Sequence, residues 1–524
     1  MSNLIFDLIF DAARVSPHAQ ALVHGAVQRD YAALARDVEC AAQVLLGQGV
    51  LRGDRVAVYL EKRVENVVAM FGASLAGAVF VPVNPLLKAE QVVHILNDCN
   101  VRVLVTSPER LVSLTPFLAD CVGLDVVMIT GVVPDDASGM AKIPLLSWNA
   151  VPAQYVPPTR AIDVDVAAIL YTSGSTGKPK GVVLSHRNLV AGAASVAGYL
   201  DVTADDRLLA VLPLSFDYGL SQLTCAFRQG ATVVLINHLF ARDIVRAVAE
   251  ERITGLAAVP PLWNQLARFA WPADCTLRYV TNSGGAMPGA TLAALRSALP
   301  NVAIFLMYGL TEAFRSTYLP PAEIDRRPGS MGRAIPNAEV LVVRPDGSLC
   351  ADDEPGELVH RGALVALGYW NDAAKTAERF RPAPGQDRAL PLVEMAVWSG
   401  DIVRRDADGY LYHIGRNDDL IKVSGYRISP AEIEETLHAS GLVEDVAVFG
   451  VPHPALGQAI VVLAVAPASL AAGVLLKECQ RRLPAYMVPA HIDLRPDAFP
   501  RNLNGKLDRA ALRAGYVHLF ESVS

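Results

Sequence analysis

The sequence lacks an excess of positive charge. Its 524 residues include 46 lysines and arginines against 53 aspartates and glutamates, so the formal net charge is −7 and the isoelectric point is about 5.9. Proteins that bind nucleic acid or anionic membranes through charge carry a basic surface, and this composition argues against both kinds of partner. A phosphate-bearing ligand therefore has to be held by a few local groups.

Cysteines at metal-binding or disulfide-like spacings are also lacking. The seven cysteines are odd in number and scattered along the chain, at positions 40, 99, 121, 225, 275, 350 and 479. Secreted disulfide frameworks and zinc sites use closely paired cysteines. We interpret the seven as reduced thiols of a cytoplasmic protein.

The patterns of a leader peptide and of a membrane span are also weak. The N-terminus is apolar, but it has no basic start and is interrupted by Asp7 and Asp11, which predicts an amphipathic helix. The uncharged run 66–87 is divided by glycines and prolines, and it is better read as a helix up to Ala78 followed by a buried strand at 79–83. We expect no membrane insertion.

What the chain does contain is alternating helical and strand patterns, with 52% hydrophobic residues. The alternation runs from Tyr31 to Pro82 and resumes from Arg207 to Met307, which predicts parallel sheets covered by helices. Residues 131–165 and 381–394 are interpreted as surface connections. The fold class is α/β: a large N-terminal domain of helix-covered sheets with a β-rich subdomain, and a small α+β C-terminal domain.

A glycine-rich stretch at residues 171–181 lies between two β-rich runs. Backbone N–H groups in such a turn can form a concavity that holds anions, with hydroxyl and ammonium groups adding to it. The donors and turn residues are Thr172, Ser173, Gly174, Ser175, Thr176, Gly177, Lys178, Lys180 and Gly181. The stretch differs from a P-loop in its glycine spacing, in Pro179 and in the strand that follows. It indicates a polyphosphate site, and a flexible Ser/Gly turn is the alternative.

Several separated motifs resemble one family, the adenylate-forming (AMP-binding) acyl-CoA synthetases, which also include peptide-synthetase adenylation domains. Besides the glycine-rich stretch, the motifs lie at 308–312, 398–401, 415–418, 421–430 and 504–506. Residues 308–321 and the segment up to 369–371 look like the AMP-forming acyl-CoA ligase associated with exosortase A systems. The resemblance implies ATP and Mg²⁺ as cofactors, and coenzyme A or a phosphopantetheine thiol as acceptor.

Within this resemblance, the nucleotide-binding residues are implied position by position. Displacing pyrophosphate from ATP accumulates charge on phosphoryl oxygens, which cations and N–H donors stabilise. The glycine-rich stretch is expected at the β- and γ-phosphates, Glu312 beside Mg²⁺ and Thr311 near the α-phosphate. For Glu312, a glutamate at a helix N-terminus is the alternative reading.

The nucleoside is expected to meet a second group of residues. Tyr308, followed by Gly309, resembles the ring that stacks on adenine, and residues 284–286 (Gly284, Gly285, Ala286) resemble the backbone that passes the adenine edge. Asp401 resembles the carboxylate that binds the ribose hydroxyls, and Arg416 a ribose or phosphate contact. The alternatives are a core aromatic, a turn aspartate and a solvated arginine.

The resemblance places the adenylation lysine at Lys506. A cation between the substrate carboxylate and the α-phosphate offsets the repulsion of two anions; without the family context it would be a solvated lysine. The family's small domain swings after adenylation, which implies an N-terminal domain at 1–415, a hinge at 416–418 centred on Asp418, and a mobile lid at 419–524. Gly425 resembles the glycine that lines the thiol channel.

The acid substrate is predicted from a separate group of residues. Phe216 and Asp217 occupy the acyl-pocket position, with Val259 and Ser283 as further substrate residues. Phe-Asp resembles amino-acid-activating members, whose aspartate pairs with the α-ammonium, and a carboxylate among apolar residues needs such a partner. A helix cap at Asp217 is the alternative, and Ala286 argues against an amino acid because those members often have glutamate there.

Three functions remain open. The first is an acid–thiol ligase that forms an acyl- or aminoacyl-adenylate, with an amino acid as the expected substrate and a separate acyl carrier protein as one expected partner. A fatty- or aryl-acid CoA ligase is its variant. The others are a P-loop-like NTPase or kinase, and a non-catalytic nucleotide-binding protein.

Overall fold

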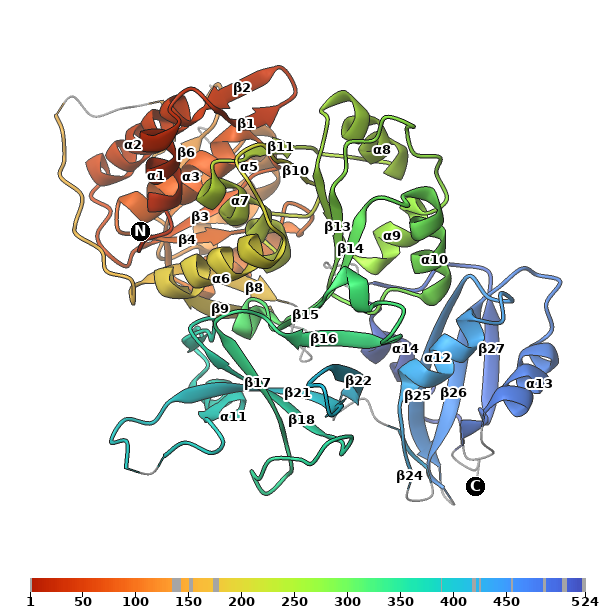
Figure 1. The fold of residues 1–524 in the computed structure, drawn as a ribbon. Helices are drawn as coiled ribbons and strands as arrows, with labels where there is room; N and C mark the ends of the chain where they lie inside the picture. The colour runs from red at the N-terminus through yellow and green to blue at the C-terminus, as the bar shows by residue number, and fades with distance from the viewer. Residues whose placement is uncertain are drawn as a thin grey trace.

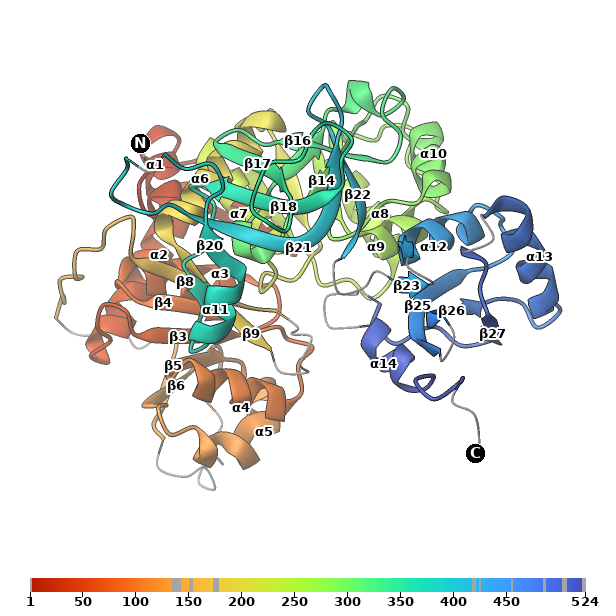
Figure 2. The ribbon, with the colours of Figure 1, turned by 90° about the horizontal axis from the view of Figure 1, so that it is seen from below.

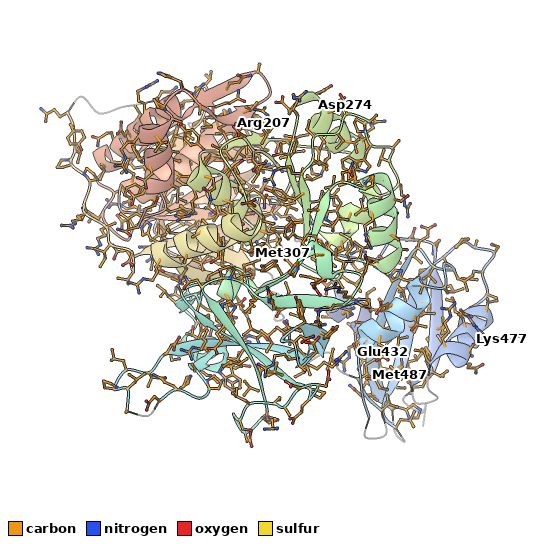
Figure 3. The ribbon with its side chains drawn as sticks, viewed as in Figure 1. Arg207, Asp274, Met307, Glu432, Lys477 and Met487 are labelled. Carbon is orange, nitrogen blue, oxygen red and sulfur yellow. The ribbon has the colours of Figure 1, made fainter. Side chains whose placement is uncertain are left out.

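The structure is a computed structural model that describes residues 2–133, 143–149, 154–172, 179–387, 389–416, 421–423, 426–453, 456–483, 487–501 and 507–520. Figures 1 and 2 show the N-terminal part, from red to teal, as a wide body, with the blue C-terminal part beside it. Met307 lies in the middle of the wide body, whereas Glu432 and Lys477 lie on the C-terminal part (Figure 3).

The helices follow the alternation expected from the sequence. Their bounds are α1 Asp7–Val15, α2 Tyr31–Gly47, α3 Val64–Leu75, α4 Ala89–Asp98, α5 Pro108–Leu114, α6 His186–Tyr199, α7 Asp217–Gln229, α8 Ala241–Glu250, α9 Pro260–Leu266, α10 Gly289–Ala298, α11 Ala373–Arg379, α12 Pro430–His438, α13 Ala472–Arg482 and α14 Arg509–Ala514. The amphipathic helix expected at the N-terminus is α1, which buries Leu8, Ile9 and Ala12.

A first sheet has the order β19-β9-β8-β4-β3-β5-β6-β7. Its strands are β3 Arg55–Tyr59, β4 Val79–Pro82, β5 Val101–Thr106, β6 Val126–Ile129, β7 Leu145–Ser147, β8 Val166–Thr172, β9 Lys180–Ser185 and β19 Gly368–Tyr369. The strands from β8 through β4 to β7 are parallel, as predicted, while β9 runs antiparallel to β8. β7 corrects the reading of 131–165 as connection alone, because a three-residue edge strand is too short to show a periodic pattern.

A second sheet has the order β17-β18-β21-β22-β16-β15-β14-β13-β12-β10-β11-β1-β2, and β20 pairs with β21. Its parallel half comprises β1 Gln20–His24, β10 Arg207–Ala210, β11 Thr232–Leu235, β12 Gly255–Ala258, β13 Tyr279–Asn282 and β14 Ala303–Tyr308, with β2 Val27–Asp30 at the edge. Its antiparallel half comprises β15 Thr317–Leu319, β16 Ser330–Ala334, β17 Ala338–Val343, β18 Gly356–Gly362, β20 Phe380–Pro382, β21 Met395–Arg405 and β22 Leu411–Arg416. The predicted β-rich subdomain therefore continues the second sheet, and β20 corrects the reading of its residues as linker.

The main hydrophobic core lies between the two sheets. It joins side chains of α2, α3, α6 and α7 to strands of both sheets. Phe71 of α3 meets Phe227 of α7 edge-on with ring centroids 5.5 Å apart, and Phe80 of β4 is buried in the same core. A second core covers the opposite face of the first sheet under α4 and α5. The uncharged run 66–87 is thus a buried helix and strand, and no described helix has the length and apolarity needed to cross a membrane.

The C-terminal part forms its own sheet and cores. The sheet order is β24-β23-β26-β25, with β27 paired to β26; the strands are β23 Ile421–Val423, β24 Tyr426–Ile428, β25 Asp445–His453, β26 Gly457–Val465 and β27 His491–Arg495. One face packs on α12 and α13, and the other on Phe499 and Leu512 of the final segment. In this structure α12 contacts β22. All seven cysteines are free thiols, as expected.

A glycine at the junction of the two halves of the second sheet gives a stability prediction. Gly332 of β16 has φ +89°, and a Cβ there would lie 1.9 Å from the Tyr318 carbonyl oxygen. We expect Gly332→Ala to lower the free energy of unfolding by roughly 3–5 kcal/mol, from backbone strain and overpacking.

The matched control is Gly409→Ala, which has φ +84° and no atom within 4 Å of the added Cβ. It should cost only about 1 kcal/mol. Urea denaturation followed by circular dichroism measures both variants, and equal shifts of the midpoint would contradict the steric account.

Candidate functional site

The glycine-rich stretch connects two paired strands. Thr172 ends β8 and lies opposite Lys180, the first residue of β9. The predicted phosphate donors from Ser173 to Lys178 lie outside the described residues. Gly181 has a packing role: a Cβ there would lie 2.7 Å from Ile169 Cγ2, so the strand pair itself requires a glycine.

Glu312 is linked to Lys180, the first residue of β9, through the Tyr369 side chain, which contacts both. It belongs to the 3₁₀ turn Thr311–Ala313, and the Tyr369 hydroxyl donates to its Oε1 at 2.5 Å. The Lys180 ammonium lies 5.6 Å from the centroid of the same ring. Burial, and then the nearby positive charge of Lys375, lowers the pKa of Lys180. For the alternative of a glutamate at a helix N-terminus, the structure shows Glu312 in a single 3₁₀ turn and not at the start of an α-helix.

Asp401 forms the centre of a polar cluster on β21. It is buried, and it lies directly opposite Arg416 of β22. Its Oδ1 is 3.2 Å from Arg416 Nη1 and 3.8 Å from His413 Nε2, while the Tyr308 hydroxyl donates to Oδ2. Burial alone would raise the pKa of Asp401, but His413, Arg416 and Tyr308 hold it below its usual value.

These contacts bear on three alternatives from the sequence. Asp401 lies inside an 11-residue strand, so it is not a turn aspartate, and Arg416 is paired with it. Tyr308 ends β14 and is partly buried, with its ring against the hydrophobic core of the β-rich part. Burial, and then the charge of Asp401, raises the pKa of Tyr308 well above its usual value, so its hydroxyl keeps its proton.

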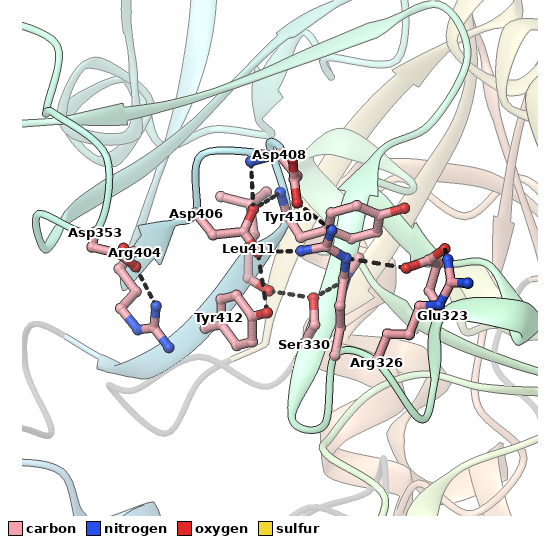
Figure 4. Close-up of polar contacts among 12 residues, drawn as sticks. Glu323, Arg326, Ser330, Asp353, Arg404, Asp406, Asp408, Tyr410, Leu411 and Tyr412 are labelled. Carbon is pink, nitrogen blue, oxygen red and sulfur yellow. Dashed lines mark hydrogen bonds and ion pairs between the residues drawn. The ribbon is translucent and has the colours of Figure 1, made fainter.

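The turn between β21 and β22 is held by an arginine network (Figure 4). Arg327 Nη1 lies 2.6 Å from Asp406 and Nη2 lies 2.5 Å from Asp408, and its guanidinium lies 3.9 Å from the Tyr410 ring centroid. Glu323 binds its Nε at 3.2 Å. The network anchors the two strands that carry Asp401 and Arg416.

The segment expected at the adenine edge follows β13. Gly284 has φ +84°, which explains a glycine there, and a Cβ on Gly285 would lie 3.2 Å from Pro260 Cγ. Ala286 is exposed. Gly309 leaves room for the returning chain, because its Cβ would lie 3.1 Å from the Cα of Arg315.

The substrate residues converge near Thr311. Helix α7 begins at Asp217 with Phe216 as its N-cap, so the reading of Asp217 as the helix cap is wrong. Asp217 is 4% exposed, and Thr311 Oγ1 donates to its Oδ1 at 3.2 Å. Asp217 therefore contacts the segment that carries Glu312.

Two other predicted substrate residues lie on neighbouring parallel strands. Val259 follows β12 as the N-cap of α9. Ser283 follows β13, is buried, and accepts a hydrogen bond from Arg315 at 3.3 Å. Both lie at carboxyl ends of parallel strands, the edge at which open α/β sheets bind ligands.

Lys506, Asp418 and Gly425 lie outside the described residues. The flanks of Lys506 are described: Arg501 and Leu507 form an isolated antiparallel bridge. After it, Asp508 caps α14 by accepting from the Ala511 backbone N–H at 3.0 Å.

Three side chains of the site were not predicted. Tyr369 binds Glu312, His413 lies beside Asp401, and Arg379 Nη1 lies 2.5 Å from the position of a Cβ on Gly400. Tyr369 stands in the segment 369–371 that was noted only for its family resemblance, and His413 and Arg379 stand in no motif. A predicted pairing of β21 with β22 would have placed His413 near Asp401. The register of this pair is irregular at 402–403, so the neighbours across it do not follow from simple counting.

Comparison with known proteins decides the family. The protein-family model described as AMP-binding enzyme matches residues 9–370, and the family model described as AMP-binding enzyme C-terminal domain matches residues 432–506. The chain belongs to the AMP-binding enzyme family. It is therefore an AMP-forming ligase that activates a carboxylic acid as an adenylate.

Relatives and solved structures span nearly the whole chain. A feruloyl-CoA synthase from Amycolatopsis is 31% identical and an L-proline–[L-prolyl-carrier protein] ligase from Pseudomonas fluorescens 32% identical, over 96% and 95% of this chain and 96% of each relative. ATP-bound MatB from Rhodopseudomonas palustris superposes with a TM-score of 0.86 at 26% identity, covering 99% of this chain and 100% of MatB. The o-succinylbenzoate CoA synthetase of Bacillus subtilis, in complex with its acyl-adenylate, gives 0.81 at 26% identity and 97% coverage of both chains.

The family's cofactors fit the described residues. A buried carboxylate beside the Arg416 guanidinium and the His413 imidazole, at Asp401, suits ribose hydroxyls and adjoining phosphates. No three His, Cys, Asp or Glu side chains of the described ranges form a metal cluster. Mg²⁺ commonly binds one carboxylate together with nucleotide phosphates, which fits Glu312 as a single protein ligand.

Proposed function

We propose that the chain activates an α-amino acid with ATP, and passes the aminoacyl group to a pantetheine thiol. The observation that carries this proposal is the hydrogen bond between Thr311 and Asp217, 3.2 Å long. Thr311 is the residue proposed near the α-phosphate, and Asp217 is the proposed ammonium partner. In an α-amino acid the ammonium and the reacting carboxylate share one carbon, so their two binding groups have to adjoin.

Each residue then has one proposed task. Asp401 and Tyr308 hold the nucleoside, and Lys180 attracts the polyphosphate. Glu312 is the ligand for Mg²⁺, and this ion would neutralise charge on the phosphates when bound. Lys506 offsets repulsion between the acid and the α-phosphate. Gly425 leaves the channel open for the thiol after the hinge at Asp418 has turned.

The acceptor follows from the substrate. If an amino acid is activated, a separate carrier protein is the better candidate, in keeping with the name of the prolyl-carrier protein ligase among the relatives. A fatty- or aryl-acid CoA ligase remains the second candidate, and Ala286 and the feruloyl-CoA synthase favour it. The narrower likeness to ligases of exosortase A systems and the domain limits at 415 and 418 stay predictions.

Pyrophosphate exchange tests the substrate class. We expect exchange with some amino acids, and a loss of about 100-fold in kcat/KM in Asp217→Ala, because the α-ammonium would lose a buried charged partner. The control Asp205→Ala removes an exposed carboxylate upstream and should leave exchange unchanged.

Exchange supported only by fatty or aryl acids would contradict the amino-acid proposal while leaving the ligase intact. Thiolation with coenzyme A and with a phosphopantetheinylated carrier protein, run in parallel, identifies the acceptor.

A further inference from the structure

Arg315 carries a buried guanidinium with unused donors. The residue is 1% exposed. Nη1 donates to Ser283 Oγ at 3.3 Å, while Nε and Nη2 make no hydrogen bond to any described residue. Its Cζ lies 4.7 Å from the centroid of the Tyr218 ring, so one face of the cation is covered by an aromatic side chain.

Other arginines with little exposure are paired with carboxylates. Arg327 and Arg110, with side chains 18% and 17% exposed, contact Asp406 and Glu61 respectively. Within the described ranges no carboxylate lies within 4 Å of the Arg315 guanidinium. A buried charge is costly unless an opposite charge or several acceptors meet it, and one serine hydroxyl and an aromatic face supply only part of that.

The Arg315 guanidinium contacts the predicted substrate residue Ser283 and the residue after Asp217. Ser283 follows β13 and Tyr218 directly follows Asp217, the proposed ammonium partner. Arg315 itself follows the turn that carries Thr311 and Glu312, and its Cδ lies 3.4 Å from the position of a Cβ on Gly309. Arg315 therefore belongs to the same segment of the chain that is proposed to hold the reacting carboxylate of the acid.

We infer that Arg315 binds a second anionic group, a carboxylate, on the acid that this enzyme activates. The inference rests on the proposed function and narrows its substrate class to acids with two carboxylates. One is activated at the α-phosphate and the other is held by the guanidinium, whose Nε and Nη2 form the edge that binds a carboxylate bidentately. With Asp217 as ammonium partner, the expected substrate is an acidic amino acid.

The experiment compares short dicarboxylic acids and acidic amino acids, each with its monoamide, in pyrophosphate exchange. Wild type should prefer each diacid to its monoamide by about 30-fold or more in kcat/KM, and Arg315→Gln should remove this preference. Arg333→Gln removes an exposed arginine of β16 and should keep it. Acidic amino acids and plain dicarboxylates are measured separately, because they differ in the α-ammonium group. Asp217→Ala, measured with both kinds of acid, then gives the contribution of the ammonium independently of Arg315.

Three outcomes overturn the inference: a wild-type preference for the monoamides, an equal loss for all acids in Arg315→Gln, or exchange with monocarboxylic acids only. The last result leaves the proposed ligase function standing. If no acid supports exchange, the proposed function fails, and thermal shift with the diacids decides on Arg315. Stabilisation of wild type but not of Arg315→Gln would support the anion site, and no stabilisation would refute it.

Discussion

Replacing Lys506 with alanine is expected to slow acid-dependent pyrophosphate exchange by about a thousand-fold. The expectation rests on charge: the acid and the α-phosphate are both anions, and a preorganised cation between them is worth about 3–4 kcal/mol in a water-excluded site. Lys506 itself lies outside the described residues; on either side of it, Arg501 and Leu507 form an isolated antiparallel bridge, and Leu507 and Leu512 pack against a core of the C-terminal sheet.

The same variant should retain the second half-reaction. If the C-terminal part presents a different face for thiol transfer, Lys506→Ala should still transfer the acyl group from a supplied acyl-adenylate at a rate close to that of wild type. Lys477→Ala is the matched control, since this lysine is exposed on α13, on the outer side of the same part of the chain (Figure 3). A loss in exchange below about tenfold would remove Lys506 from the adenylation step.

The second large effect is expected from Asp401→Ala. Its carboxylate accepts from Tyr308 and pairs with Arg416, and we propose that it also accepts from the ribose hydroxyls. Losing charge-assisted hydrogen bonds to both hydroxyls should raise the KM for ATP by roughly 100-fold or more. Because its pKa is held below the usual value, the carboxylate stays ionised, and the effect should persist across neutral and alkaline pH.

A deoxy substrate makes this test specific. Wild type should use ATP much better than 2′-deoxy- or 3′-deoxy-ATP, whereas Asp401→Ala should use them about equally. Asp408→Ala is the control: its carboxylate is 69% exposed in the neighbouring turn and pairs with Arg327, so it should keep the discrimination. If Asp401→Ala reduces the use of ATP and of both deoxy analogues by the same factor, Asp401 has only a structural role.

The regular elements were predictable because their patterns are local. β5, Val101–Thr106, is buried at every position except Arg102, as a strand covered on both faces requires. α6 begins after Ser185, where Ser185 and Asn188 cap each other's backbone N–H groups. Short edge strands such as β7 carry too few residues for any periodicity.

The site was predictable only where a motif marks it. Glu312 and Asp401 stand in such motifs, and the structure places each against another polar group of the site. The Asp401–Arg416 pair depends on a strand pairing with an irregular register, and the burial of Arg315 depends on the packing of Tyr218, Ser283 and Gly309. Such long-range packing cannot be read from residue spacing. For the same reason Gly181 was assigned to anion binding, although it serves the β8–β9 contact with Ile169.

Rapid quenching of a single turnover tests the central claim most directly. The enzyme is mixed with labelled ATP, Mg²⁺ and the preferred acid, without thiol, and the products are separated. The account predicts one pyrophosphate per active site, released together with an equal amount of the acid joined to AMP through a mixed anhydride. ADP and inorganic phosphate as products, or AMP formed equally well without any acid, would contradict it.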